Sequence, residues 1–312
     1  MNKHSLAVTK IAARDFTWDL DLSQEELGCL LELTRQVKAA PRRYAQALSG
    51  RYISLLFEKP SLRTRLTFEL AIKQLGGDSV MSAGPIGDRE PIKDVARNLE
   101  RWTRGLVART FSQRTVEELA RWATVPVINA LSDLYHPCQA LADIFTLKEH
   151  FGTLRGLKLA FVGDGNNVAH SLMLTSARLG AHFALATPAR YGPKPEIVRQ
   201  AEGLAAVCGA TLKVTRDPRE AVAGADAVYT DVWTSMGHEQ ETAERRRTFR
   251  RYQVNEKLFA LAAPEAVFMH CLPAKRDEEV TDAVIESARS VVFDQAENRL
   301  HTQKALLLML LE

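Results

Sequence analysis

The sequence has few cysteines, little net charge and no long apolar run. An apolar run at residues 305–311 is far too short to span a membrane, and the first residues carry charges rather than the continuous apolar stretch of a secretion signal. The net charge of +3 is small for 312 residues, so we expect neither a nucleic-acid nor a membrane partner. The four cysteines, Cys29, Cys138, Cys208 and Cys271, are too scattered for a disulfide framework or paired zinc spacing. We therefore expect a protein of the reducing cytoplasm.

What is present is an ordinary globular composition, with 46% hydrophobic and 25% charged residues, in a chain long enough for two domains. Residues 1–150 are predicted to be helix-rich with a few strands. After the turn-rich stretch 152–156, strands and helices alternate, ending with a strand at 290–293. Such alternation predicts an α/β fold with two lobes, each a mainly parallel sheet flanked by helices. The second domain is expected at 151–294, with a C-terminal helix at about 295–312 packing back on the first.

The most informative stretch is Pro60-Ser61-Leu62-Arg63-Thr64-Arg65, between a predicted strand and a predicted helix. At a helix start the first N–H groups lack partners and the helix dipole favours an anion. The planar fork of arginine matches phosphate oxygens. The stretch therefore predicts a phosphate cradle, and the alternative is an ordinary capped helix with solvated arginines.

A glycine-containing turn, Gly163-Asp164-Gly165-Asn166-Asn167, lies between a predicted strand and a predicted helix. A dinucleotide site is disfavoured because Val168 occupies the third glycine position and the next strand does not end in an acidic residue. The adjacent amides of Asn166 and Asn167 can both donate and accept hydrogen bonds, which suits a zwitterionic ligand. The alternative is plain helix capping.

Three further candidates lie at the ends of predicted elements. His136 precedes a proline, which holds it extended, so that a neutral imidazole can aim at a carbonyl oxygen; the alternative is a simple helix-entry turn. Asp231 suits an ammonium group, or serves as a turn aspartate. Cys271 follows His270, but neighbours in a strand point to opposite faces, so a ligand-contacting or buried thiol is favoured over a nucleophile.

A basic run, Arg245 to Arg247 followed by Arg250 and Arg251, comes after several glutamates. Helical ion pairs of this kind are common and weak. We therefore expect a solvated helix face without a function in the site.

In chain order, these residues resemble the motif set of the ornithine carbamoyltransferases. The resemblance runs from about residue 52 to the end, and seven motifs at family-like spacing make it specific. The motifs are Pro60–Arg65, Arg109-Thr110, His136–Gln139, Gly163–Asn167, Asp231 with Ser235-Met236-Gly237, His270–Pro273, and Glu297–Arg299. The Ser-Met-Gly and His-Cys-Leu-Pro motifs favour ornithine over aspartate, N-acetylornithine or N-succinylornithine as the acceptor.

The resemblance implies transfer of a carbamoyl group from carbamoyl phosphate to the δ-amine of L-ornithine, as a step of arginine biosynthesis. The first domain would bind carbamoyl phosphate, and the second would bind ornithine. Arg109, His136, Cys271 and Arg299 would be catalytic. The carbamoyl phosphate contacts would be Ser61, Leu62, Arg63, Thr64, Arg109, His136, Gln139, Cys271, Leu272 and Arg299. The ornithine contacts would be Asn167, Asp231, Ser235 and Met236.

The resemblance also implies a homotrimer that needs neither a metal nor an organic cofactor. Two positions depart from the family pattern. Leu62 replaces the usual threonine, which is tolerable if this position contributes its N–H. Pro85 replaces a glutamine in a loop that reaches a neighbouring subunit in the family, where Arg89 and Lys93 could supply replacement charge. The alternatives left open are another amino-acid acceptor, or a non-catalytic relative that binds phosphometabolites.

Overall fold

The computed structural model describes residues 11–234 and 239–311 and divides the chain into two compact units. Unit 1 comprises Met1–Phe145 and Asn298–Glu312, and unit 2 comprises Thr146–Glu297. The chain therefore passes between the units within two helices, α5 (Pro137–Phe151) and α12 (Val292–Leu311). None of the helices in the described ranges is both long and apolar enough to cross a membrane.

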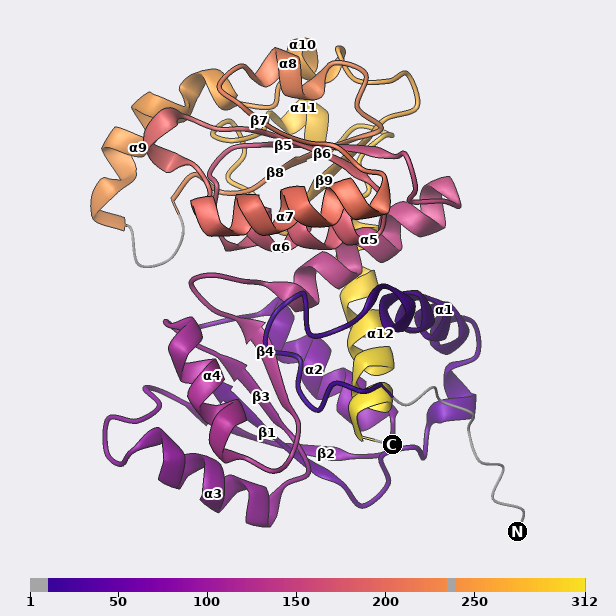
Figure 1. Ribbon diagram of the computed structural model, residues 1–312, viewed down its shortest axis with the longest axis vertical. Coiled ribbons are helices and arrows are strands. Elements are labelled where there is room, and N and C mark those ends of the chain that lie inside the picture. The colour runs from indigo at the N-terminus through magenta and orange to yellow at the C-terminus, as the bar shows by residue number, and fades with distance from the viewer. Residues whose placement is uncertain (1–10, 235–238, 312) are drawn as a thin grey trace. The chain divides into compact units, whose positions relative to one another are not determined.

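Unit 1 is built on a four-stranded parallel sheet with the strand order β2-β1-β3-β4. Helices α3 and α4 lie on one side of this sheet, and α1, α2 and α12 lie on the other (Figure 1). The elements of this unit, besides α5 and α12, are α1 (Gln24–Ala39), a 3-10 turn (Pro41–Tyr44), β1 (Tyr52–Phe57), α2 (Arg63–Gln74), β2 (Asp78–Ala83), α3 (Ile92–Trp102), β3 (Leu106–Arg109), α4 (Gln113–Trp122) and β4 (Val127–Leu131).

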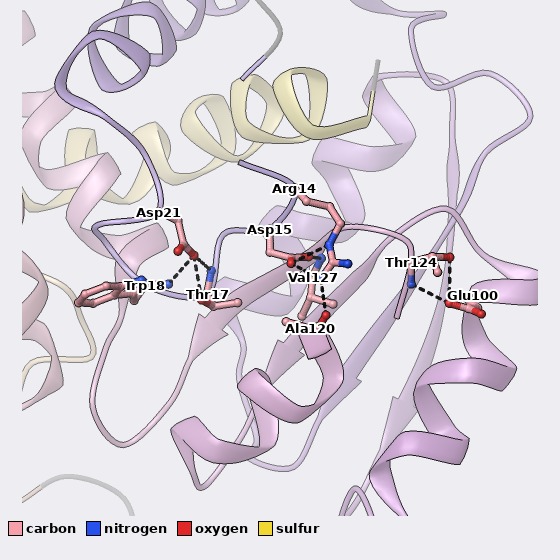
Figure 2. Close-up of polar contacts among 9 residues, drawn as sticks. All are labelled: Arg14, Asp15, Thr17, Trp18, Asp21, Glu100, Ala120, Thr124 and Val127. Carbon is pink, nitrogen blue, oxygen red and sulfur yellow. Dashed lines mark hydrogen bonds and ion pairs between the residues drawn. The ribbon is translucent and has the colours of Figure 1, made fainter. Parts of the chain in front are cut away.

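The N-terminal segment of unit 1 is tied to its sheet by a carboxylate. Asp15 accepts from the N–H of Val127 in β4 at 2.8 Å, while Asp21 closes a turn within the segment by accepting from the N–H of Thr17 at 2.6 Å (Figure 2). The Lys38 ammonium of α1 also donates to the Asn298 amide oxygen of α12 at 2.8 Å. The bonds of Asp15 and Lys38 are charge-assisted and join segments distant in sequence around one core.

Unit 2 is built on a five-stranded parallel sheet with the order β7-β6-β5-β8-β9. Helices α6 and α7 lie on one side of the sheet, and α8, α10 and α11 lie on the other (Figure 1). The strands are β5 (Lys158–Val162), β6 (His182–Ala186), β7 (Leu212–Thr215), β8 (Ala227–Thr230) and β9 (Val267–His270). The helices are α6 (Asn167–Arg178), α7 (Pro195–Cys208), α8 (Pro218–Val222), α9 (Thr242–Phe249), α10 (Glu256–Phe259) and α11 (Asp282–Ile285), with 3-10 turns at Ala189–Tyr191, Glu239–Glu241 and Arg250–Tyr252.

The predicted α/β fold with two mainly parallel sheets is confirmed. The strand predicted at residues 290–293 is wrong, because Ser290 forms an isolated bridge to Phe268 and α12 begins at Val292. A short buried apolar pair, here Val291 and Val292, satisfies either a strand or a helix start.

The order of the strands creates a switch point in each sheet. In unit 1, β1 leads to β2 on one side while its neighbour β3 leads to β4 on the other; in unit 2, β5 leads to β6 on one side while its neighbour β8 leads to β9 on the other. In open α/β sheets, ligands bind at such points, outside the carboxyl ends of the strands. Each unit therefore presents one preferred place for a ligand.

Candidate active site

The switch point of unit 1 is occupied by the start of α2, the element predicted to cradle a phosphate. The N-cap residue, Leu62, makes no side-chain capping bond to the first N–H groups of this helix. Leucine has no polar side-chain atom, so this residue can offer a ligand hydrogen bonds only from its backbone. The helix dipole adds partial positive charge at the same place. This helix start therefore has the form of an anion-binding site.

Three side chains from separate elements converge on this helix start. The Thr64 hydroxyl accepts hydrogen bonds from Arg109 Nη1 at 3.4 Å and from Arg299 Nη2 at 2.5 Å. Arg109 ends β3 and Arg299 lies on α12, yet all three side chains are buried. Two guanidiniums held at one buried point can bind a multiply charged anion by paired N–H bonds. We call Thr64, Arg109, His136 and Arg299 the unit 1 cluster.

His136, the fourth member of the unit 1 cluster, is buried just before α5. Burial holds the pKa of its imidazole well below the ordinary value, and the positive charges of Arg299 and Arg109 lower that pKa further. The ring is therefore neutral near pH 7. A neutral imidazole beside two cations can donate an N–H to a carbonyl oxygen without adding a third charge.

Gln139, in the first turn of α5, is buried, with a relative exposure of 1%. Its amide nitrogen donates to Asp143 Oδ1 at 2.7 Å, whereas its oxygen Oε1 accepts no hydrogen bond within the described residues. A buried acceptor without a donor is unfavourable. The oxygen is thus suited to accept an N–H from a ligand.

The buried His136 predicts a pH dependence of stability. Unfolded histidine titrates near ~6.5, and because the folded pKa lies lower, the unfolded state binds more protons below that pH. The free energy of unfolding should therefore fall on acidification from about pH 7.5 to about 5.5, with up to ~1.4 kcal/mol per pH unit from this residue. Urea titrations at several pH values give the free energy of unfolding of wild type and His136→Gln. This free energy should change less steeply with pH in the variant. The exposed His150→Gln is the control, and equal slopes in wild type and His136→Gln would contradict the assignment.

The switch point of unit 2 brings together the turn after β5 and the residue after β8. Asn166 caps α6, since its Oδ1 accepts from the N–H groups of Val168 at 3.0 Å and Ala169 at 3.1 Å. The same side chain donates from Nδ2 to Asp231 Oδ2 at 2.8 Å. The neighbouring Asn167 accepts with its Oδ1 from the N–H of Val168 at 3.0 Å. The amide that contacts Asp231 is that of Asn166, which the sequence suggested for a zwitterionic ligand but did not include among the expected ornithine contacts.

Asp231 links this turn to the cysteine after β9. Its Oδ1 accepts from the Cys271 thiol at 3.1 Å and from the N–H of Val232 at 2.8 Å. The carboxylate is 7% exposed, so it combines a buried negative charge with a small accessible surface. Such a group binds an ammonium strongly, because a charge-assisted hydrogen bond gains strength away from water.

His270 shapes the turn that follows β9 and does not act on Cys271. Its Nδ1 accepts from the N–H of Leu272 at 2.8 Å, which leaves Nε2 to donate to Glu279 Oε1 at 3.2 Å. Glu279 also accepts from the N–H of Lys275 at 2.6 Å. Both ring nitrogens are thus used, as expected for a ring that is not the base of a Cys-His pair.

Ligand atoms of Asp231, His270 and Cys271 lie within 4.8 Å of one another, a grouping that could hold a metal ion. The hydrogen bonds described above account for this grouping without an ion. Two other predicted contacts, Ser235 and Met236, lie outside the described residues.

The basic run contains one residue for which the predicted solvated face is wrong. Arg245 is 6% exposed, and its guanidinium pairs with Asp164 at 2.7 Å and with Glu241 at 2.8 Å. Arg246 and Arg247 are exposed, as predicted. The glutamate four residues earlier signals a helical ion pair, but the partner in the glycine turn could not be read from spacing.

Comparison with known proteins agrees with the geometry of both units. The family model described as aspartate/ornithine carbamoyltransferase, carbamoyl-P binding domain, matches residues 14–149, and the one described as the Asp/Orn binding domain matches residues 155–310. The chain is 50% identical over 303 residues to an ornithine carbamoyltransferase of Acidothermus cellulolyticus, covering 96% of this chain and 97% of that protein.

Two similarities involve Pyrococcus furiosus. The protein named "Ornithine carbamoyltransferase, anabolic" is 48% identical over 309 residues, which cover 97% of this chain and 98% of that protein. A solved structure of ornithine carbamoyltransferase from the same organism superposes with a TM-score of 0.94 at 47% identity, covering 97% of this chain and 99% of that one.

Proposed function

Because the chain belongs to the aspartate/ornithine carbamoyltransferase family, we propose that it transfers the carbamoyl group of carbamoyl phosphate to the δ-amine of L-ornithine. The products are L-citrulline and phosphate. The observation that carries the proposal is the nearly full-length identity of about half to ornithine carbamoyltransferases, in a chain that keeps both the arginine-rich and the acidic site.

In unit 1 we assign carbamoyl phosphate to the start of α2. The backbone of Ser61, Leu62, Arg63 and Thr64 would bind the phosphate, with the Arg63 side chain and Arg109 neutralising its charge. Arg299 and neutral His136 would donate to the carbonyl oxygen. The bonds from Arg109 and Arg299 to Thr64, together with the lowered pKa of His136, support this assignment.

We assign the carbamoyl nitrogen to Gln139. An amide nitrogen of the substrate can donate but cannot accept, and Gln139 Oε1 is a buried acceptor without a donor in the described residues. Substrate binding would satisfy this oxygen and fix which face of the carbamoyl carbon is open to attack. The contacts of Cys271 and Leu272 with carbamoyl phosphate, expected from the family resemblance, stay predictions.

In unit 2 we assign the acceptor amino acid to the Asn166–Asp231–Cys271 group. Asp231 would bind the α-ammonium, which its burial and its two hydrogen-bonded neighbours support. The α-carboxylate of the acceptor would accept a hydrogen bond from the side-chain amide of Asn167, the first residue of α6. Ser235 and Met236 stay predicted contacts of the α-amino end.

The reaction proposed is a direct displacement at the carbamoyl carbon. The neutral δ-amine forms a C–N bond and gives a tetrahedral intermediate, whose oxyanion Arg299 and His136 stabilise. The C–O bond to phosphate then breaks, and the departing phosphate takes the proton from nitrogen. The oxyanion is thus stabilised by two side chains of this chain and the charge on nitrogen is removed by phosphate, and the proposal assigns no step to a metal or an organic cofactor.

We propose a homotrimer whose contact surface includes exposed apolar side chains of α2 and of the edge strand β2. Leu66 and Leu70 on α2, and Val80 and Met81 on β2, are 39–58% exposed, and the two elements pack against each other. Apolar exposure on an edge strand is typical of a covered surface. Light scattering should give three times the 34.8 kDa chain mass, and a monomer mass would contradict the proposal.

We propose that the reaction is a step of arginine synthesis and takes place in the cytoplasm. The Pyrococcus furiosus relative named as anabolic supports a role in synthesis. The four cysteines form no disulfide within the described residues, which supports a reducing compartment.

An acceptor panel tests the proposed function. Purified protein is incubated with carbamoyl phosphate and, separately, with ornithine, N-acetylornithine or aspartate, and phosphate and ureido product are measured. We expect citrulline and phosphate in equal amounts with ornithine. Faster reaction with another acceptor would replace the substrate assignment, and no reaction with any acceptor would favour a non-catalytic binding protein.

A further inference from the structure

Arg245 on α9 is a buried cation that none of the proposed reaction steps uses. Its guanidinium donates to Asp164 Oδ2 at 2.7 Å, to Glu241 Oε2 at 2.8 Å and to the carbonyl oxygen of Trp233 at 2.9 Å. The guanidinium carbon also lies 4.6 Å from the centre of the Tyr191 ring. A charge at 6% exposure is costly unless hydrogen bonds to the protein replace those it would make with water. The partners of Arg245 supply such bonds, so they stabilise the guanidinium in this one position.

Two of these partners belong to the segments that carry the acceptor-site side chains. Asp164 lies two residues before Asn166, in the turn after β5. The Trp233 carbonyl lies two residues after Asp231, in the segment after β8. Asn166 and Asp231 in turn join the same two segments through their own hydrogen bond. A single guanidinium thus bonds to both of the segments that the Asn166–Asp231 hydrogen bond joins.

Tyr191, whose ring lies under the Arg245 guanidinium, also supports the glycine turn. The carbonyl oxygen of Tyr191 accepts from the N–H of Gly165 at 2.8 Å. A Cβ at Gly165 would come within 2.4 Å of the Pro193 nitrogen, so the turn sits directly against this backbone. Since Arg245 stacks on the Tyr191 ring, it stabilises the backbone segment that contacts the glycine turn.

We propose that Arg245 is a positioning residue for the acceptor amino acid: it holds the turn bearing Asn166 and the segment bearing Asp231 at the spacing that the α-amino end of the acceptor requires. The proposal rests on the proposed function for its substrate. A site built from two loops depends on such support, and small displacements of a binding group have large effects on affinity. Arg245 would act on acceptor binding and not on carbamoyl phosphate, because the ligands assigned to carbamoyl phosphate from the structure lie in unit 1 and its two predicted contacts in unit 2, Cys271 and Leu272, are not among the Arg245 partners named above.

The test compares Arg245→Gln, Arg245→Lys and Asp164→Asn with Arg247→Gln, an exposed arginine of the same helix. For Arg245→Gln we expect the KM for ornithine to rise roughly tenfold or more, with the KM for carbamoyl phosphate within about twofold and kcat at saturating ornithine nearly unchanged. Arg245→Lys keeps the charge but not the fork, so its KM for ornithine should fall between those of wild type and Arg245→Gln. Arg247→Gln should match wild type.

Two comparisons separate positioning from general destabilisation. The double variant Asp164→Asn/Arg245→Gln should raise the KM for ornithine no further than the worse single variant, because both changes remove the same bond. A KM for ornithine within about twofold of wild type in Arg245→Gln, or equal rises in both KM values, would overturn the proposal. If Arg245→Gln does not fold, the KM values of Asp164→Asn for ornithine and carbamoyl phosphate are judged by the same criteria.

Failure of this inference is distinguishable from failure of the proposed function. If wild type uses a different amino acid, the proposed function fails, and the KM for that amino acid becomes the quantity compared among the variants. If wild type forms citrulline and the Arg245 variants bind ornithine normally, the inference alone fails.

Discussion

Replacing Arg109 with glutamine is expected to lower kcat/KM for carbamoyl phosphate by roughly three orders of magnitude. The side chain ends β3 with its guanidinium at the start of α2, where it donates to Thr64. Two charge-assisted hydrogen bonds to the phosphate and the carbonyl side, each worth about 1.5–3 kcal/mol, correspond to losses of about 10²- to 10⁴-fold. Steady-state rates of phosphate release with ornithine saturating would measure the loss.

The matched control for Arg109 is Arg114→Gln. Arg114 lies in the next helix, its side chain is 83% exposed, and its ion pair with Glu118 at 3.8 Å is a surface pair. Turnover by this variant should equal that of wild type. A loss below about tenfold in Arg109→Gln would show that the unit 1 cluster does not bind the reacting anion.

Asp231→Asn is expected to raise the KM for ornithine by about a hundredfold or more while changing the KM for carbamoyl phosphate little. Removing one partner of a buried, hydrogen-bonded charge pair costs about 2–5 kcal/mol. The asparagine is nearly the same size, but its amide group would turn a donor toward Asn166 or Cys271, both of which already donate to Asp231. Initial rates with each substrate varied in turn would separate the two KM values.

The control for Asp231 lies at the opposite end of the same strand. Asp226 precedes β8 and accepts from the N–H of Lys158 at 2.8 Å, away from the proposed acceptor site. Asp226→Asn should leave both KM values unchanged. If Asp231→Asn instead raised the two KM values equally, the assignment of ornithine to unit 2 would be wrong.

Much of the fold could be predicted because buried parallel strands and amphipathic helices leave strong patterns. The strand predicted before the Pro60–Arg65 stretch is found as β1, and the helix predicted at its end is found as α2. The edge strand β2 escapes prediction because nearly all its residues are exposed, so it shows no alternation between apolar and polar positions. Its partner β1 determines that it forms a strand, and that information is not local.

The site shows the same division between local and long-range information. Arg109 in unit 1 and Asp231 in unit 2 could each be placed at the carboxyl end of a strand, which is where a parallel sheet binds its ligand. Which of Asn166 and Asn167 contacts Asp231 depends on the direction in which α6 begins, and both residues fit a cap. The burial of Arg245 depends on Asp164, 81 residues away, so its run of arginines looked like a solvated face.

Isotope transfer in a single incubation tests the central claim most directly. Carbamoyl phosphate labelled with ¹³C at the carbonyl carbon and ornithine labelled with ¹⁵N at the δ-amine are mixed with the purified protein, and the product is examined by NMR and mass spectrometry. The account predicts citrulline with a ¹³C–¹⁵N bond, formed in equal amount with phosphate and lost in Arg109→Gln. The account would be contradicted if folded wild-type protein released phosphate without forming this bond, or if it formed no product.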